Sequence, residues 1–177
     1  ERKGIDKVIN VLPVLEKNFP QIKYIVVGKG PQLEEYKELA KKRGVQESVI
    51  FTGFVQDNEL PLYYNLCDVF VMASSYLEKS FISEGFGIVF LEANACAKPV
   101  IGVAQAGMTD SIIDGKTGLL LKEPNKKELQ KAIEKILGNE EFANQLGLAG
   151  QKRIEQSLNW PNVVKKFEQS LLEVKSN

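Results

Sequence analysis

Apolar residues follow two alternating patterns along this chain, one typical of helices and one typical of buried strands. Near the start they recur every three or four positions, which places them on one face of a helix. These residues are Ile5, Val8, Ile9, Leu12, Leu15 and Phe19. Short continuous apolar runs between turn residues predict buried strands. The expected strands cover residues 22–27, 49–53, 68–73, 100–103 and 117–121.

Helical patterns separate these runs. They cover residues 32–43, 59–66, 109–114, 125–137, 139–156 and 161–174, and a further helix is expected to carry Glu92. Strands that alternate with helices and form unbroken apolar runs favour a parallel sheet covered on both faces. We therefore expect an α/β fold, a doubly wound parallel sheet of the Rossmann-like kind, as a single domain over residues 1–177.

The two ends of the chain carry separate expectations. The first helix has no strand before it, although a βαβ domain normally opens with one. We expect that the first strand is lacking and that the chain is a fragment of a longer protein. The alternative is an α/β domain that simply opens with a helix. The last helix, about residues 160–174, is expected to pack back on the domain, with Trp160 in the core.

Composition narrows the classes of function. Lys plus Arg equals Asp plus Glu at 23 each, so no net charge attracts nucleic acid or an anionic membrane, and an anion site must be local. The chain has no histidine and no Asp-x-Asp, which removes His-based triads, His metal sites and the simplest acidic metal clamp. Cys67 and Cys96 are predicted to be reduced, buried thiols. No signal peptide and no membrane-spanning apolar run is found, and a cytoplasmic location is expected.

The most informative motif lies between residues 84 and 92. Glu84 precedes a Gly-Phe-Gly that suits the start of a helix, where free backbone N–H groups can bind an anion. If Glu92 lies two turns inside that helix, the two carboxylates are roughly 12 Å apart along its axis. This spacing suits a ligand with polar groups at both ends and negative charge between them. A nucleotide sugar is such a ligand.

Motifs along nearly the whole chain resemble those of one family. They are Lys3-Gly4-Ile5-Asp6, Val27-Gly28-Lys29-Gly30-Pro31, residues 49–55, 84–92, 95–101 and 114–121, and Asn159-Trp160. Each is weak alone, but their order and spacing are specific. The chain resembles the C-terminal, donor-binding domain of the family 4 retaining glycosyltransferases, which have the GT-B fold.

The resemblance implies roles for residues of the two-glutamate motif. Glu84 would be the catalytic residue, bonding hydroxyls of the donor sugar and stabilising positive charge at its anomeric carbon. The backbone N–H groups of Gly85, Phe86, Gly87 and Ile88 would bind sugar and phosphate oxygens. A surface glutamate that caps a helix is the ordinary alternative for Glu84.

Six further donor-binding residues follow from the same resemblance. Glu92 would accept hydrogen bonds from the two ribose hydroxyls, and Lys3 would lie beside the leaving diphosphate, where a cation offsets growing charge. Gly28 and Gly30 would let the backbone pass close to the donor. The base would lie against Phe54 and Val55, although ordinary core at the end of a strand is an equal alternative for those two.

The implied parent enzyme transfers a hexose, mannose or glucose, from an NDP-sugar to a glycan or lipid-linked acceptor in polysaccharide biosynthesis. It needs no cofactor, and this half binds no metal. The N-terminal acceptor domain is absent from the chain, and nucleic acid is not a partner. Peripheral membrane association would concern the parent alone. Asp110, where the family usually has Glu, and the longer loop 74–83 favour GDP-mannose over UDP-glucose as the donor.

Two other functions remain open on the sequence. One is a sugar-nucleotide epimerase of the same fold, and the other is a nucleotide-binding domain without chemistry. An NAD-type Rossmann domain is disfavoured because Gly28-x-Gly30-Pro31 lacks the third glycine of that motif.

Overall fold

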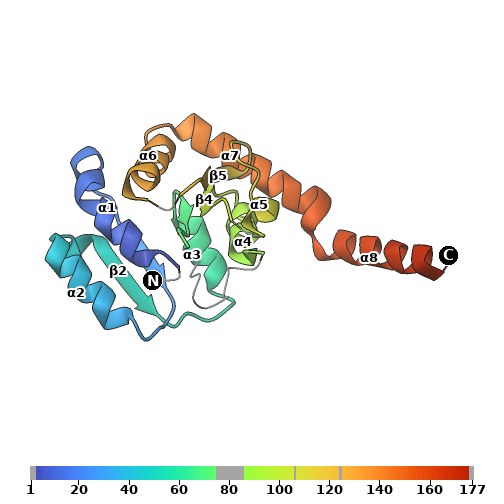
Figure 1. Cartoon of the computed structure of the whole chain (residues 1–177), viewed down its shortest axis with the longest axis horizontal. Helices are drawn as coiled ribbons and strands as arrows, with labels where there is room; N and C mark the ends of the chain where they lie inside the picture. Colours follow the sequence, from blue (N-terminus) through green and yellow to red (C-terminus); the bar gives the residue numbers. More distant parts are fainter. Residues whose placement is uncertain (1–2, 75–85, 106, 124, 176–177) are drawn as a thin grey trace.

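Helices and parallel strands alternate along the chain, as the sequence predicts (Figure 1). The computed structural model describes residues 3–74, 86–105, 107–123 and 125–175. The strands are β1 (Tyr24–Val27), β2 (Val49–Gly53), β3 (Phe70–Val71), β4 (Val100–Val103) and β5 (Gly118–Leu121). The helices are α1 (Ile5–Asn18), α2 (Leu33–Arg43), α3 (Leu60–Leu66), α4 (Ile88–Ala95), α5 (Met108–Ser111), α6 (Lys126–Leu137), α7 (Glu140–Arg153) and α8 (Trp160–Lys175). A 3₁₀ turn (Gln46–Ser48) precedes β2, and a π-helical turn (Ile154–Leu158) joins α7 to α8.

The described strands form two parallel sheets rather than one continuous sheet. β1 pairs with β2, and β3, β4 and β5 form the second sheet in that order. All of these pairings are parallel, which confirms the predicted α/β class. β3 is shorter than the expected strand 68–73, because regular pairing with β4 covers only Phe70 and Val71.

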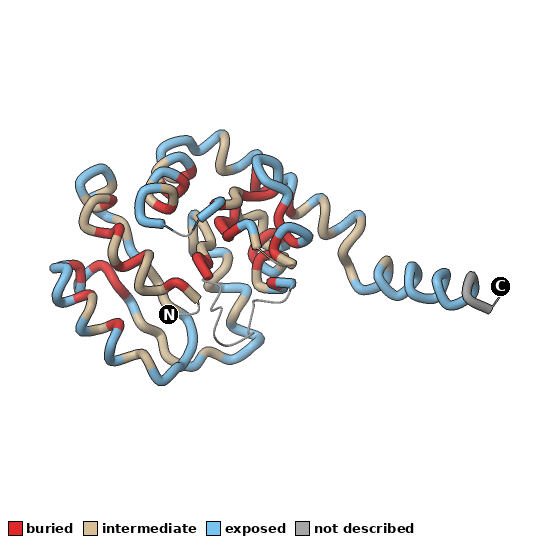
Figure 2. Tube along the Cα trace, in the orientation of Figure 1, coloured by how far each residue is buried: buried red, intermediate tan, exposed pale blue. Residues whose placement is uncertain are grey.

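One hydrophobic core joins the two sheets. Its buried residues come from α1, from β2 and from β4 and β5, with α6 also contributing. Val8, Ile9, Val11, Leu12 and Leu15 of α1 are all buried. The predicted apolar face of the first helix is therefore confirmed, except that Phe19 lies beyond the end of α1 as its C-cap. α1 contacts α2 on one side and α6 on the other. The buried residues gather on the inner sides of these elements (Figure 2).

α8 leaves the body of the domain instead of packing back on it (Figure 1). The prediction that Trp160 belongs to the core is wrong, because 79% of this residue is exposed. Among the residues of α8 whose burial is described, six apolar ones are exposed: Trp160, Val163, Val164, Phe167, Leu171 and Leu172. They recur at helical spacing, which explains why the sequence indicates a packed helix. Within the described residues, no helix is long and apolar enough to cross a membrane.

Candidate functional site

The start of α4 depends on a glycine in a left-handed conformation. Gly87 has φ 76° and immediately precedes Ile88, the first residue of the helix. The N–H of Phe90 donates to the Gly87 carbonyl at 2.9 Å, and Phe90 is fully buried. A Cβ on Gly87 would lie 2.7 Å from Cδ2 of Phe90. Both the backbone angle and this close approach require glycine here.

The residues on either side of Gly87 are exposed. Ile88 is 61% exposed and Phe86 is 40% exposed, so neither is an ordinary core residue. The first N–H groups of a helix have no acceptor within it, and an anion can bind them. Glu84 and Gly85 lie outside the described residues, so their contacts with the donor stay predictions.

Glu92 is exposed on the second turn of α4, and a tyrosine holds its carboxylate. The Tyr64 hydroxyl, from α3, donates to Oε2 of Glu92 at 2.7 Å. The Tyr64 ring packs edge to face on Phe70, with centroids 5.6 Å apart. Phe70 packs in the same way on Phe90, with centroids 5.7 Å apart. These aromatic contacts join α3, β3 and α4, and they fix the position from which Tyr64 reaches Glu92.

Burial and the hydrogen bond to Glu92 keep the Tyr64 phenol protonated. Burial is the larger cause, and both raise the pKa of Tyr64 far above its ordinary value. Tyr64 therefore acts as a donor to the carboxylate at all physiological pH values. The sequence did not identify Tyr64, because the contact spans 28 positions and the residue looks like any aromatic of an amphipathic helix.

The two cysteines lie beside this pair and are free thiols. Both are half-buried rather than fully buried as predicted. The Cys67 thiol donates to the carbonyl of Tyr64 at 3.2 Å, and burial raises the pKa of Cys67 to about 11. Burial also raises the pKa of Cys96. Both groups are therefore neutral near Glu92 at pH 7.

The predicted close approach of the backbone to the donor and the predicted base contacts lie after the carboxyl ends of β1 and β2. Gly28 has φ 122°, and its N–H donates to the Gly53 carbonyl at 2.9 Å. A Cβ on Gly28 or Gly30 would meet nothing within 4 Å, so the space beside both is open. Phe54 is 66% exposed and is not core, and Nζ of Lys29 lies 5.1 Å from its ring centroid. Val55 is half-buried.

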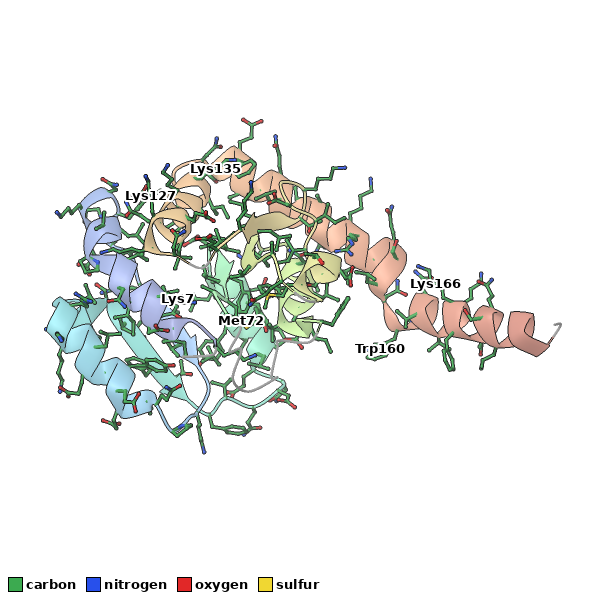
Figure 3. All side chains as sticks on the ribbon, in the orientation of Figure 1. Lys7, Met72, Lys127, Lys135, Trp160 and Lys166 are labelled. Atoms are coloured by element: carbon green, nitrogen blue, oxygen red, sulfur yellow. The ribbon has the colours of Figure 1, made fainter. Side chains whose placement is uncertain are left out.

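The start of α1 packs against the residues that follow β3. Gly4 has φ 75°, and a Cβ there would collide with the Ala73 carbonyl. Nζ of Lys7, which is labelled in Figure 3, donates to the same carbonyl at 3.2 Å. Lys3 lies half-buried in the turn before Gly4. The turn that contains the predicted diphosphate lysine therefore leads directly into the Gly4 contact with Ala73, just before the stretch toward Glu84.

Three of the predicted segments follow the carboxyl ends of parallel strands, where ligands bind in open α/β sheets. Gly28 follows β1, Phe54 follows β2, and the stretch toward Glu84 follows β3. The structure joins Glu92 directly to Tyr64, and Lys29 directly to Phe54. Across the described part of the chain, no group of three His, Cys, Asp or Glu residues is placed to hold a metal ion.

Comparison with known proteins decides the family. Residues 1–153 match the family described as glycosyl transferases group 1. The chain belongs to this family. Its strands and helices are those of the C-terminal, Rossmann-like domain of GT-B glycosyltransferases.

One relative and two solved structures show how far the likeness extends. The chain is 34% identical, over 90% of its length and 42% of the relative, to the GDP-mannose-dependent α-(1-6)-phosphatidylinositol monomannoside mannosyltransferase of Mycolicibacterium smegmatis. It matches the sucrose-phosphate synthase of Thermosynechococcus elongatus with TM-score 0.81 and 28% identity, over 99% of this chain and 43% of that one. It matches the C-terminal domain of a glycosyl transferase group 1 protein of Francisella tularensis with TM-score 0.77 and 25% identity, over 90% and 81% of the two chains. The chain spans about two fifths of the length of the curated relatives it matches.

Proposed function

We propose that this chain is the donor-binding domain of a retaining hexosyltransferase. The parent enzyme would transfer mannose or glucose from an NDP-sugar to a glycan or lipid-linked acceptor. The observation that carries the proposal is the α4 site, where a glycine-led helix start precedes a carboxylate held by Tyr64. Family membership and a relative at 34% identity that is named a GDP-mannose-dependent mannosyltransferase support the same reading.

The proposed arrangement assigns each part of the donor to a residue. Glu92 accepts hydrogen bonds from the ribose hydroxyls, and the N–H groups of Gly87 and Ile88 bind the diphosphate. Lys3 offsets charge on the leaving diphosphate as the glycosidic bond breaks. Glu84 bonds the sugar hydroxyls and stabilises positive charge at the anomeric carbon. The base lies against Phe54, whose exposed ring offers an apolar surface.

GDP-mannose is the proposed donor. The relative from Mycolicibacterium smegmatis is named for that donor, and Asp110 stands where the family pattern usually has Glu. The acceptor would bind through the rest of the parent protein. Because the donor of a GT-B enzyme lies between two domains, this chain would hold the donor without completing the transfer.

Calorimetry on the full-length protein tests the binding half of the proposal. We expect GDP to bind, and Glu92→Ala to weaken binding by about tenfold or more, because two charge-assisted hydrogen bonds are lost. Glu35→Ala is the matched control, since Glu35 is an exposed helical glutamate far along the chain from α4. Equal affinities for the wild type and the Glu92→Ala variant would refute the assignment of the ribose site.

A donor screen with NMR of the product tests the reaction. We expect transfer of a hexose with the anomeric configuration of the donor kept. An inverted product would contradict retention. Conversion of free UDP-N-acetylhexosamine without any acceptor would instead identify an epimerase, and full activity of Glu84→Gln would favour a nucleotide-binding domain without this chemistry.

A further inference from the structure

A cationic hollow lies between three helices, apart from the residues assigned to the donor. Its volume is about 270 Å³, and it is lined by Lys7 and Asn10 of α1, Arg43 of α2 and Lys126 of α6. α1 contacts both α2 and α6, so the three helices bring these side chains together from separate parts of the sequence. None of the four residues belongs to the predicted donor site.

Arg43 is held in place by a neutral partner rather than by a carboxylate. Its Nε donates to Oδ1 of Asn10 at 2.6 Å, and Nδ2 of Asn10 donates to the Asp6 carbonyl at 2.8 Å. In the described part of the chain, Arg43 makes no ion pair. The two Nη groups of its planar guanidinium can donate two parallel hydrogen bonds to the oxygens of one phosphate. The hydrogen bond to Asn10 limits the rotamer freedom that binding would otherwise remove.

Lys7 and Lys126 add charge on the two other helices. Nζ of Lys7 donates to the Ala73 carbonyl, so the amine is partly withdrawn from water. Burial lowers the pKa of Lys7, while the nearby Asp6 carboxylate opposes that shift. Lys126 is the first residue of α6, where the helix dipole adds positive potential. No ion pair involves Lys126 among the residues that the structure describes.

We propose that this hollow binds a soluble phosphate-bearing anion of about the size of diphosphate. The lining supplies three cations and one amide, and the Asp6 carboxylate beside Lys7 offsets part of that charge. An ordinary solvated surface would scatter such cations or pair them, as Lys37 pairs with Glu34 and Lys41 with Glu38 on α2. Here the cations surround a concave space, where one anion can contact several of them at once.

Calorimetric titration of inorganic pyrophosphate into the full-length protein tests the proposal. We expect saturable binding that weakens as salt rises, because the contacts are charged and partly exposed. Arg43→Gln and Lys126→Gln should each weaken binding by about tenfold, the loss of one charge-assisted contact. The matched controls are Lys42→Gln and Lys127→Gln, which remove exposed charges next in sequence to the lining residues and should leave the affinity unchanged.

Further variants separate this hollow from the donor site and from a lipid source of phosphate. Pyrophosphate affinity that falls in Lys3→Gln but not in Arg43→Gln would place the anion in the donor site and overturn the proposal. The absence of saturable binding would overturn it too. A third contrary result concerns phosphatidic acid vesicles. The proposal is overturned if the protein binds these vesicles, if pyrophosphate does not compete with them, and if Arg43→Gln abolishes this binding. Because the donor test uses Glu92→Ala, the two proposals can fail separately.

Discussion

Tyr64 makes Glu92 a positioned carboxylate rather than a solvated one. Its hydroxyl holds one carboxylate oxygen at 2.7 Å, and the contact with Phe70 holds the ring. One oxygen of Glu92 is thus oriented before any ligand binds. In the proposed function, this limits the freedom that the carboxylate loses when ribose binds.

Removal of the Tyr64 hydroxyl should therefore weaken nucleotide binding without unfolding the domain. We expect Tyr64→Phe to lower the affinity for GDP by about three- to tenfold, because a hydrogen bond to a charged group is lost while the ring stays. Calorimetry on the full-length protein measures this effect. Tyr63→Phe is the control, since Tyr63 is the adjacent half-buried tyrosine. If Tyr64→Phe lowers the stability of the fold but leaves the affinity for GDP unchanged, the Tyr64 hydroxyl has a structural role only.

The pH dependence of the Cys67 thiol tests whether the region beside Tyr64 and Glu92 is buried. Its pKa of about 11 lies above the ordinary 9.0, so the folded protein favours the neutral thiol. The raised pKa contributes to the free energy of unfolding. This contribution is fully present below pH 9 and is lost as pH rises through about 11. In a Cys96→Ala background at pH 8, we expect alkylation of Cys67 to be about 100-fold slower in the folded protein than in urea. Mass spectrometry measures both rates, and a folded thiol that titrates near pH 9 would contradict the buried environment.

Residue types were easier to predict than residue contacts. The helix that begins after Gly87 and carries Glu92 follows from local sequence, because backbone angle and helix start are local properties. The hydrogen bond from Tyr64 depends on how α3 packs near α4, which no local pattern specifies. Trp160 was misplaced for a related reason, since an apolar helical face does not say what covers it.

At the scale of elements, α7 supports the helix that carries the site. Two glycines of α7, Gly147 and Gly150, allow it to approach the end of α4. A Cβ at Gly147 would collide with the Ala97 carbonyl, and one at Gly150 would lie 2.5 Å from the Asn94 side-chain amide. Nδ2 of Asn94 in turn donates to the Thr117 carbonyl at 3.1 Å, next to β5. The orientation of α4 therefore depends on close packing that lies outside the site.

Gly147→Ala should disrupt this packing. We expect a loss of about 2 kcal/mol or more in the free energy of unfolding, because the clash is with backbone and outweighs the better helix propensity of Ala. Urea denaturation measures the change. Leu148→Ala is the control at the next position, where the side chain is 60% exposed, and it should change stability by only about 0.5 kcal/mol. Equal effects of the two variants would mean that α7 and α4 are not tightly apposed.

At the scale of the whole molecule, the division of the sheet is the main departure from expectation. β1 pairs with β2 and β3 pairs with β4, so β1 and β3 each keep one edge unpaired within the described residues. α1 nevertheless packs on core residues of both sheets. We propose that a strand preceding α1 in the parent protein pairs with β1 and β3 and makes one sheet. Parallel pairing on both sides would then bring the segments after β1, β2 and β3 to a common edge.

This arrangement explains why the chain can carry donor contacts and yet be part of a larger site. Phe54, Ile88 and Glu92 are all exposed. The curated relatives are more than twice as long as the portion that matches this chain. In the proposed function, the rest of the parent protein would bind the acceptor.

The crystal structure of the full-length protein with GDP tests the central claim most directly. We predict that both ribose hydroxyls lie within about 2.6–3.2 Å of the Glu92 carboxylate, with the diphosphate at the N–H groups of Gly87 and Ile88. The bond between Tyr64 and Glu92 should persist in that complex. GDP bound elsewhere, with Glu92 out of hydrogen-bonding reach of the nucleotide, would contradict the proposed donor site.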